Sequence, residues 1–437
     1  MELLFRNITA VTMRDEEPVI KNAYLGITGG RISWLSTEEP QEAADRVIDG
    51  TNLVVMPGLV NAHTHLAMTL MRGYADDYAL QTWLYDHVFP VEAKLDDRCV
   101  AAGFKLGVAE CLAHGITSVS DMYMRIPSEG QAALETGIKA NISNGATCFD
   151  RANYNFDTDS VTLQMREMLD KYHLADNGRI KLDASIHGEY TSFPELWEAN
   201  AAFAREHALC MHVHMSETQS EHNDCIGRWG MSPAAVLNKH GVFDTRALVA
   251  HGVWITEEDM DILREKNVTV AHNPVSNLKL GSGVAPVAKM LHKGVRVALG
   301  TDGVCSNNNH DLFEEIKLAA ILQKGVSMDP TLLPAWQTLK LATVGGAYAQ
   351  GREGECGVLA VGMDADLAVL DFDAPNLYPS HSPVSALCYA ARGSNVCMTL
   401  VRGRVLYERG AFATIDMEQL RHELDSHVMP RLFGHTV

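Results

Sequence analysis

Histidines and one aspartate stand at the ends of several apolar runs, and these side chains are suited to metal binding. His63 and His65 close the run MPGLVNAHTH, His214 stands in HVHMSE, and Asp302 stands in ALGTDG. On an extended strand, residues two apart point the same way, so His63 and His65 would present two imidazoles to one side. Three neutral imidazoles and one carboxylate, with room for a water, are typical of a catalytic metal site. We expect these four residues to bind one divalent metal ion, although His63 and His65 alone would also suit a polar loop.

Further residues near the same ends are suited to acid–base chemistry. Glu217 follows His214 by three residues, so it would lie beside a metal without having to bind it. A carboxylate in that position can carry a proton between a metal-activated water and a heteroatom of a substrate. His251, in VAHGV, could hold the attacking oxygen as charge develops on it. His212 is interpreted as a core or supporting histidine, whereas His272 suits either support or simple packing.

Composition and charge exclude some classes of binding partner. The 437 residues include 36 Lys plus Arg against 55 Asp plus Glu, a formal net charge of −19. Such an acidic chain is unsuited to a nucleic-acid backbone or to anionic lipid, so we expect neither a nucleic-acid nor a membrane partner. The nine cysteines form no C-x-x-C pair, and the opening MELLFRNITAV lacks the apolar stretch typical of a signal peptide. We therefore expect reduced thiols and a cytoplasmic location.

Eight apolar runs alternate with helical stretches through the middle of the chain. The runs are LVVMPGLV, GITSVSDM, IKANISNG, RIKLDASIHG, CMHVHMSE, RALVAHGV, VTVAHNP and RVALGTDG. Nearly continuous apolar runs are typical of parallel strands covered on both faces. With helices between them they predict an α/β fold, a TIM-type (β/α)8 barrel, in which chemistry lies at the carboxyl ends of the strands. The histidines and the aspartate described above stand at those ends.

Both ends of the chain are rich in β-type sequence, which predicts a second, smaller domain. LLFRNITAVTM, YLGITGGRISWL and RVIDGTNLVVM lie near the start, and GVLAVGMDADLAVLDFD and NVCMTLVRGRVLYERG lie near the end. We expect a small β-sandwich domain assembled from residues 1–55 and 355–410. The barrel would then cover residues 56–350, and residues 411–437 would form a C-terminal helical tail.

In these motifs and their order, the chain resembles the deaminase and chlorohydrolase branch of the amidohydrolase superfamily. MPGLVNAHTH, HVHMSE, VAHGVW, AHNPVSNLKLG and ALGTDG carry the resemblance over nearly the whole chain. The stretch THLAMTLMRGYADDYALQTWLYDHVFPVEAKL, residues 64–95, is especially similar to the 5-methylthioadenosine/S-adenosylhomocysteine deaminases. The resemblance implies a hydrolase acting on C–N bonds in cyclic amidines. It would convert an adenine nucleoside, by attack at C6, to the inosine analogue and ammonia.

The resemblance also implies how the metal is held. It makes His63, His65, His214 and Asp302 the ligands of zinc, with Fe2+ or Mn2+ as alternatives, and it makes Asp302 the acceptor of the water proton. Barrel hydrolases with two metals often bridge them through a modified lysine at the end of strand 4. Here His187 stands at that end, which favours a single metal ion.

Roles in substrate binding and proton transfer are implied in the same way. Glu217 would give a proton to the ring nitrogen N1, and His251 would polarise the hydroxide. Glu92 would accept hydrogen bonds from the two ribose hydroxyls, which suits the two acceptor oxygens of a carboxylate. His187 would contact the nucleoside, and Ser306 would line the same pocket. No organic cofactor is expected.

The sequence departs from its relatives where a substrate carboxylate would bind. Relatives that accept S-adenosylhomocysteine hold that carboxylate with arginines after strand 3 and in the following segment. Here Asn144 stands at the first position, and ATCFDRANYNFDTDS offers only Arg151 among three aspartates. Without a well-placed arginine, a carboxylate in the pocket would be poorly compensated. We therefore expect methylthioadenosine, 5′-deoxyadenosine or adenosine to be preferred to S-adenosylhomocysteine.

Two alternatives and one further expectation stay open at this point. A deaminase or chlorohydrolase of free heterocycles, of the guanine, 8-oxoguanine or s-triazine type, would share the metal site but would have no use for Glu92. A non-catalytic scaffold is a remote alternative, because a degenerate barrel should have lost some of its metal ligands. Relatives commonly assemble, so a homo-oligomer is also considered.

Overall fold

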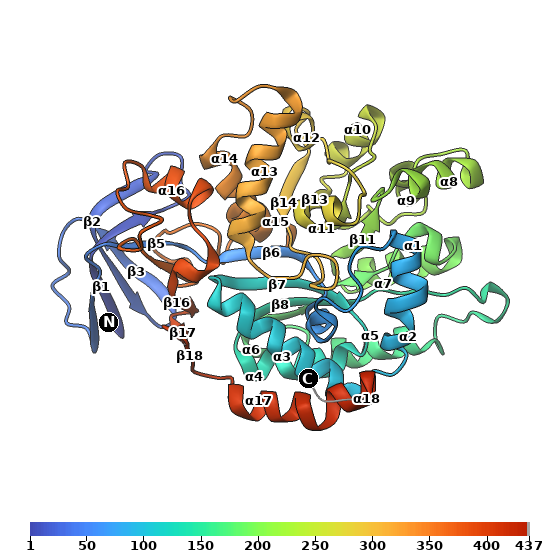
Figure 1. Cartoon of the computed structure of the whole chain (residues 1–437), viewed down its shortest axis with the longest axis horizontal. Coiled ribbons are helices and arrows are strands. Elements are labelled where there is room, and N and C mark those ends of the chain that lie inside the picture. Colours follow the sequence, from blue (N-terminus) through green and yellow to red (C-terminus); the bar gives the residue numbers. More distant parts are fainter. Residues whose placement is uncertain (435–437) are drawn as a thin grey trace.

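The computed structural model describes residues 1–434 and shows a barrel with a twisted sheet beside it (Figure 1). The barrel strands are buried almost throughout, because helices cover their outer faces and side chains fill the interior. In chain order they are β6 (Leu59–Thr64), β7 (Ile116–Tyr123), β8 (Lys139–Asn144), β9 (Ile180–Leu182), β10 (Ala184–Ser185), β11 (Met211–Met215), β12 (Ala247–His251), β13 (Thr269–His272) and β14 (Arg296–Leu299).

The barrel closes through its fourth strand and between its first and last strands. β9 pairs with β8 and β10 pairs with β11, and only Asp183 separates the two pieces, so together they serve as one bent strand. On the opposite side the backbone N–H of Asp302 donates to the carbonyl of His63 at 2.9 Å, just beyond the end of β14. The predicted (β/α)8 fold class is confirmed, and its closure brings His63 and Asp302 side by side.

The helices that surround the barrel begin at clear sequence signals. The Asp96 side chain accepts from the N–H of Cys99 at the start of α3, and Pro194 opens α7, where its missing N–H has no cost. The longer helices are α3 (Asp97–Ala113), α4 (Ile126–Thr136), α5 (Ser160–Lys171), α7 (Pro194–Glu206), α8 (Gln219–Trp229), α9 (Pro233–Lys239), α10 (Glu257–Glu265), α13 (Leu312–Ser327) and α16 (Pro383–Tyr389). Shorter ones are α1 (Leu80–Thr82), α2 (Phe89–Glu92), α6 (Ala175–Gly178), α11 (Pro274–Lys279), α12 (Val287–His292), α14 (Ala335–Lys340) and α15 (Gly346–Ala349).

Strands from both ends of the chain form one mixed sheet of nine strands, which lies to the left of the barrel in Figure 1. Its order is β18-β17-β16-β15-β5-β1-β2-β3, with β4 paired to β1. The predicted small β domain from both termini is confirmed, and the sheet is consistent with a β-sandwich. The limits 1–55 and 355–410 stay a prediction. The strands are β1 (Leu3–Val11), β2 (Val19–Thr28), β3 (Arg31–Ser36), β4 (Arg46–Asp49), β5 (Leu53–Pro57), β15 (Leu367–Asp371), β16 (Val396–Val401), β17 (Arg404–Glu408) and β18 (Ala411–Phe412).

One predicted barrel strand is two strands in different sheets. The run LVVMPGLV was expected to open the barrel as a unit, but β5 pairs with β1 and β15 in the terminal sheet, and only β6 belongs to the barrel. Gly58 separates them at a point of close approach, where an added Cβ would meet the Thr117 side chain at 2.2 Å. Both halves of the run are buried and apolar, so hydrophobicity alone could not reveal the break.

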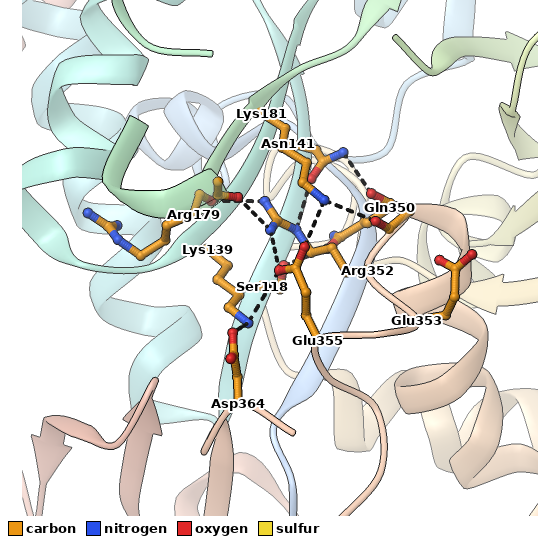
Figure 2. A network of polar contacts seen from close by, with 12 residues as sticks. Ser118, Lys139, Asn141, Arg179, Lys181, Gln350, Arg352, Glu353, Glu355 and Asp364 are labelled. Atoms are coloured by element: carbon orange, nitrogen blue, oxygen red, sulfur yellow. Dashed lines mark hydrogen bonds and ion pairs between the residues drawn. The ribbon is translucent and has the colours of Figure 1, made fainter. Parts of the chain in front are cut away.

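Opposite the mouth of the barrel, a buried polar network ties its floor to the terminal sheet (Figure 2). Lys139, at the start of β8, is fully buried, and its Nζ lies 2.7 Å from Asp364 Oδ2 and 2.6 Å from Asp366 Oδ2. Arg352 donates to Glu355 Oε2 at 2.9 Å and to backbone carbonyls of the barrel. A buried cation is tolerated only when it is paired in this way.

The C-terminal helices α17 (Met417–Glu423) and α18 (Met429–Phe433) lie at the bottom of Figure 1, where α17 and residues 424–428 pack against α3. Arg98 of α3 makes two hydrogen bonds of 2.7 Å to Glu423. The predicted helical tail from residue 411 therefore begins as strand β18 and turns helical only at Met417, and residues 435–437 lie outside the described part. Within residues 1–434, no helix has both the length and the apolar character needed to cross a membrane.

Candidate active site

Side chains from three strands of the barrel converge at its mouth. His63 lies in β6 with His65 just beyond it, His214 lies in β11, and Asp302 follows β14. Nitrogen atoms of His63, His65 and His214 all lie within 4.8 Å of one another, and so do the ligand atoms of His63, His251 and Asp302. Asp302 Oδ1 is 3.4 Å from Nε2 of His63 and 3.2 Å from Nε2 of His65. The strand ends thus bring the predicted metal ligands together.

The second nitrogen of two of these rings is held by the backbone, which fixes the tautomer. His65 Nδ1 bonds the carbonyl of Met122, and His214 Nδ1 bonds the carbonyl of His187 at 2.7 Å. Because a carbonyl oxygen can only accept, each Nδ1 carries the hydrogen, and each Nε2 presents its lone pair to the centre of the site. The two rings are therefore oriented as ligands.

The converging lone pairs make the site suited to a cation. Nε2 of His65 and Nε2 of His214 are only 3.3 Å apart, with Asp302 Oδ1 beside them. Such acceptors repel one another unless a positive charge lies among them. Burial opposes a charge on His65, yet the hydrogen bond and charge of Asp302 outweigh it and raise its pKa to about 9, so a proton on Nε2 takes the place of the cation when no metal is bound. Among the described residues, Nε2 of His63 has no hydrogen-bond partner. This donor set fits a divalent metal ion.

Supporting side chains fix the orientation of the ligands. His63 Nδ1 lies 2.9 Å from His212 Nε2, so His212 supports a ligand, in agreement with one interpretation of the sequence. Asp302 Oδ2 accepts from Ser276 Oγ at 2.6 Å and from Ser306 Oγ at 3.2 Å. With Oδ2 occupied, Oδ1 is left to face the imidazoles. His272 differs, because neither of its ring nitrogens has a partner in the described chain, and burial lowers its pKa to about 3.

Glu217 is held beside the imidazoles by a strained turn. Ser216, which precedes it, has a φ of 51°, in the left-handed region that non-glycine residues rarely adopt. The side chain of Glu221 stabilises the turn by accepting from the N–H groups of Ser216 and Glu217, each at 2.7 Å. Burial raises the pKa of Glu217, and the charge of His251 opposes that rise. A carboxyl group with a raised pKa is suited to donate a proton near neutral pH.

His251 faces Glu217 across the site. Its Nδ1 lies 2.9 Å from Oδ1 of Asn277, and its Nε2 lies 3.8 Å from Glu217 Oε2. The φ angles of His251 and Asp302 are 76° and 61°, so these two residues also adopt left-handed conformations. Backbone strain of this kind is retained where the surrounding structure demands a particular side-chain direction.

A cavity of about 560 Å³ opens above these residues. Its wall includes Glu92, His187 and Ser306, the three side chains predicted to contact a substrate. Burial raises the pKa of Glu92 to about 7 and lowers that of His187 to about 4, so His187 is neutral at physiological pH. The volume is that of a pocket for a small organic molecule. Apolar side chains line most of the remaining wall, namely Met68, Leu80, Trp83, Leu84, Phe89, Leu95, Met122, Met124, Phe149, Val161 and Leu280.

Comparison with known proteins agrees with this geometry. The model of the amidohydrolase family matches residues 54–406, and that of the BsNagA composite domain matches residues 2–50. The chain belongs to the amidohydrolase family. The predicted family is thereby confirmed, and the two matches together cover nearly all of the chain from β1 into β17.

Among the proteins that resemble the chain over nearly its full length are deaminases of adenine nucleosides. The chain is 42% identical to a 5-methylthioadenosine/S-adenosylhomocysteine deaminase of Acetivibrio thermocellus, over 96% of this chain and 97% of that protein. It is 40% identical to a 5′-deoxyadenosine deaminase of Methanosphaera stadtmanae, over 91% of this chain and 93% of that protein. An adenosine deaminase from Xanthomonas campestris, solved with bound zinc, superposes with a TM-score of 0.90 at 32% identity, over 97% and 98%. The amidohydrolase site of this chain is therefore a divalent-metal site.

Asn144 and Arg151, the two positions considered for binding a substrate carboxylate, lie outside the cavity wall. Asn144 is buried and donates to the carbonyl of Val161 at 3.0 Å, and Arg151 pairs with Glu195 at the surface. Arg125, which follows β7, does line the cavity and is bound by Asp97 at 2.9 Å. It lies outside the segments after strand 3, where the sequence led us to expect an arginine.

Two aromatic residues of the amidohydrolase cavity were also missed. Trp83 and Tyr123 line it, and neither Trp83 Nε1 nor the Tyr123 hydroxyl has a hydrogen-bond partner among residues 1–434. Tyr123 is the last residue of β7, one position past the predicted run GITSVSDM. A search of the strand ends for polar aromatic groups, as well as for histidine and aspartate, would have found it.

Proposed function

We propose that this chain hydrolyses the amino group from C6 of an adenine nucleoside and releases the inosine analogue and ammonia. The observation that carries the proposal is the convergence of three imidazoles and a carboxylate beside Glu217, in a cavity that also holds the buried carboxyl of Glu92. The names of the relatives support the substrate class: methylthioadenosine, S-adenosylhomocysteine, 5′-deoxyadenosine and adenosine all contain the same base and sugar.

One metal ion, most suitably zinc, would be held by His63, His65, His214 and Asp302. When bound, it would supply an activated water at neutral pH. The bound zinc of the structural relative and the nitrogen-rich donor set favour zinc over Fe2+ or Mn2+. Metal analysis of the purified protein by mass spectrometry would test the identity of the ion and the ratio of one ion per chain.

The side chains of the protein would divide the proton transfers. As oxygen adds to C6, Asp302 would accept the proton of the attacking water, and Glu217 would donate a proton to N1 of the ring. His251 would hold the attacking oxygen through its Nε2. A proton then passes to the amino group, the C6–N bond breaks, and ammonia leaves. Water and the nucleoside together supply every atom of the two products.

Substrate binding would rest on the cavity wall. Glu92 would accept hydrogen bonds from both ribose hydroxyls, and neutral His187 and Ser306 would contact the nucleoside nearer the reacting end. Most of the remaining wall is apolar, and Asp97 already engages the guanidinium of Arg125 in it. Methylthioadenosine, 5′-deoxyadenosine and adenosine are therefore proposed ahead of S-adenosylhomocysteine.

A screen of ammonia release from the zinc-loaded protein tests the function directly. The substrates are adenosine, 5′-deoxyadenosine, methylthioadenosine, S-adenosylhomocysteine, adenine and guanine. We expect turnover of the nucleosides and little turnover of the free bases. Turnover of free bases alone would favour the heterocycle hydrolase, and no turnover of any compound by protein that holds its metal would favour the scaffold.

Location and assembly complete the proposal. All nine cysteines, which lie within the described residues, are free thiols, and this supports a reducing compartment such as the cytoplasm. Assembly into a homo-oligomer stays a prediction. Light scattering of the purified protein would measure its mass against that of one chain.

A further inference from the structure

We propose that Tyr123 is a second residue that binds the sugar of the substrate, by donating a hydrogen bond to a ribose hydroxyl whose own hydrogen is accepted by Glu92. The proposal rests on the proposed function, because it requires a substrate with a ribose. It adds a specificity-determining group to the cavity.

The position of Tyr123 places its phenol in the cavity and close to the reacting centre. It ends β7, its ring centroid is 6.5 Å from that of His65, and it lines the same cavity as Glu92. The side chain is only 7% exposed. A residue held at the end of a barrel strand is fixed by the backbone on one side and by the packed core on the other, which suits it to precise contact.

The hydroxyl of Tyr123 lacks a partner although it is buried. No donor or acceptor of the described chain meets it in hydrogen-bonding geometry, although the carboxyl of Glu92 lies close beside it. Buried hydroxyls are nearly always bonded, and an exception at the wall of a cavity calls for a ligand or a water. Burial, followed by the charge of Glu92 and the interaction of the phenol with that carboxyl, holds the pKa of Tyr123 well above its usual range, so the group keeps its hydrogen and can donate.

The chemistry of a cis-diol accounts for both side chains. A carboxylate has only acceptor atoms, so Glu92 can receive the two hydroxyl hydrogens and nothing more. The diol oxygens then keep lone pairs that are buried in an otherwise apolar wall, and each lone pair left without a donor weakens binding. Tyr123 supplies a donor at that place. Together, Glu92 would accept hydrogen bonds from the ribose hydroxyls and Tyr123 would donate one to a ribose oxygen.

The test combines a change in the enzyme with a change in the substrate. KM and kcat are measured for wild type and Tyr123→Phe with adenosine, 2′-deoxyadenosine and 3′-deoxyadenosine. We expect Tyr123→Phe to raise KM for adenosine about tenfold, the loss of one hydrogen bond to a buried group, with kcat changed less than about twofold. For the deoxynucleoside that lacks the bound oxygen, wild type and variant should have the same KM.

Other results would overturn the proposal. If Tyr123→Phe changes KM equally for all three substrates, or for none, Tyr123 does not contact a sugar hydroxyl. If the wild type deaminates none of the three, the proposed function is wrong, and the role of Tyr123, which depends on it, is wrong as well. Tyr172→Phe is the matched control, because it removes a phenol hydroxyl that bonds Gln131 outside the cavity and should leave all constants unchanged.

A second measurement keeps the test decisive if Tyr123→Phe folds poorly. In Glu92→Gln, the wild-type preference for adenosine over the affected deoxynucleoside should shrink but persist, because the Tyr123 donor remains. Complete loss of that preference in Glu92→Gln alone would assign all sugar recognition to Glu92 and would contradict a role for Tyr123.

Discussion

Glu217 and Glu92 are buried carboxyl groups in one cavity, and their surroundings suit them to different tasks. Glu217 lies on a strained turn and 3.8 Å from His251, next to the imidazoles that face the metal position. Glu92 ends a short helix and has an apolar surrounding with Tyr123 as its polar neighbour. Burial raises both pKa values. For Glu217, a raised pKa favours proton donation. For Glu92, it sets the pH below which the ribose is bound less well.

The role of Glu217 predicts a specific loss. Glu217→Gln keeps the size of the side chain but removes the transferable proton, so kcat should fall by about 10²- to 10⁴-fold. The metal content should stay at the wild-type value, because Glu217 is not a proposed ligand. Ammonia release and metal analysis on the same sample measure both. Glu167→Gln, at an exposed pair with Lys171, is the control. Turnover near the wild-type rate in Glu217→Gln would contradict the proton-donor role.

The pKa of Glu92 predicts how binding depends on pH. The carboxylate is the form that accepts two hydrogen bonds, and with a pKa of about 7 it is lost as the pH falls below 7. KM for adenosine should therefore rise toward acid pH, approaching about tenfold per pH unit. Glu92→Gln should have a higher KM without this slope. 2′,3′-Dideoxyadenosine, which has no diol, serves as the control, and an equal slope with it would assign the effect to another group.

The position of Arg125 predicts how well the enzyme accepts a substrate with a charged 5′ substituent. It is the residue with a guanidinium group in the cavity wall, and Asp97 engages one of its nitrogens. A carboxylate at the end of a 5′ substituent could pair with the others, so Arg125→Met should lower kcat/KM for S-adenosylhomocysteine by about threefold to tenfold and leave that for methylthioadenosine unchanged. Asp97→Asn should have the opposite effect. Parallel losses on both substrates would show that Arg125 acts only on the shape of the cavity.

At the scale of the elements, the strand ends were the most informative part of the sequence. Parallel strands of a barrel all present their carboxyl ends to one mouth, so polar residues at those ends had to meet wherever they stood in the chain. His63, His214 and Asp302 meet for that reason. The assigned roles stay predictions until the variants are measured.

What the sequence did not reveal depends on contacts between distant segments. Gly58, at the break between β5 and β6, leaves room for the Thr117 side chain, and Ser276 matters only because α11 brings it to Asp302. The turn at Ser216 is stabilised by Glu221, four residues beyond Glu217, which has the appearance of an ordinary helix cap in the sequence. Local patterns predict elements, but these partners are chosen by the tertiary fold.

The buried network around Lys139 at the floor of the barrel predicts that one substitution there will strongly lower the free energy of unfolding. Lys139→Met would leave Asp366 buried without its cation, whereas Asp364 would keep Arg402 at 2.9 Å, and breaking a buried pair in this way costs about 3–5 kcal/mol. The midpoint of urea unfolding should fall accordingly. Lys139→Met combined with Asp364→Asn and Asp366→Asn should recover part of the loss, since neither buried carboxylate is then left without the lysine. Lys171→Met, at an exposed pair, should change stability by less than about 0.5 kcal/mol. A loss equal in the single and triple variants would point to packing rather than charge.

At the scale of the whole molecule, two polar centres lie at opposite ends of one barrel. The floor network joins the barrel to the terminal sheet, whereas the mouth gathers residues from β6, β11 and the end of β14. Neither centre can form before the barrel closes, because each joins segments that lie far apart in the chain: Lys139 with Asp364 in the floor, and His63 with Asp302 at the mouth. Folding of the barrel, attachment of the terminal sheet and assembly of the site are therefore linked.

Metal binding should consequently stabilise the entire chain. The mouth holds converging lone pairs that repel one another without a cation, and the ligands come from both sides of the closing seam between β14 and β6. A ligand that binds only the folded state adds about 2.7 kcal/mol when it is present at a hundred times its Kd. Removing zinc with a chelator should therefore lower the melting midpoint by several degrees, and adding zinc back should restore it. His214→Asn, which weakens the site, should melt at nearly the same temperature with and without zinc. The same shift in this variant as in wild type would mean that zinc acts elsewhere on the protein.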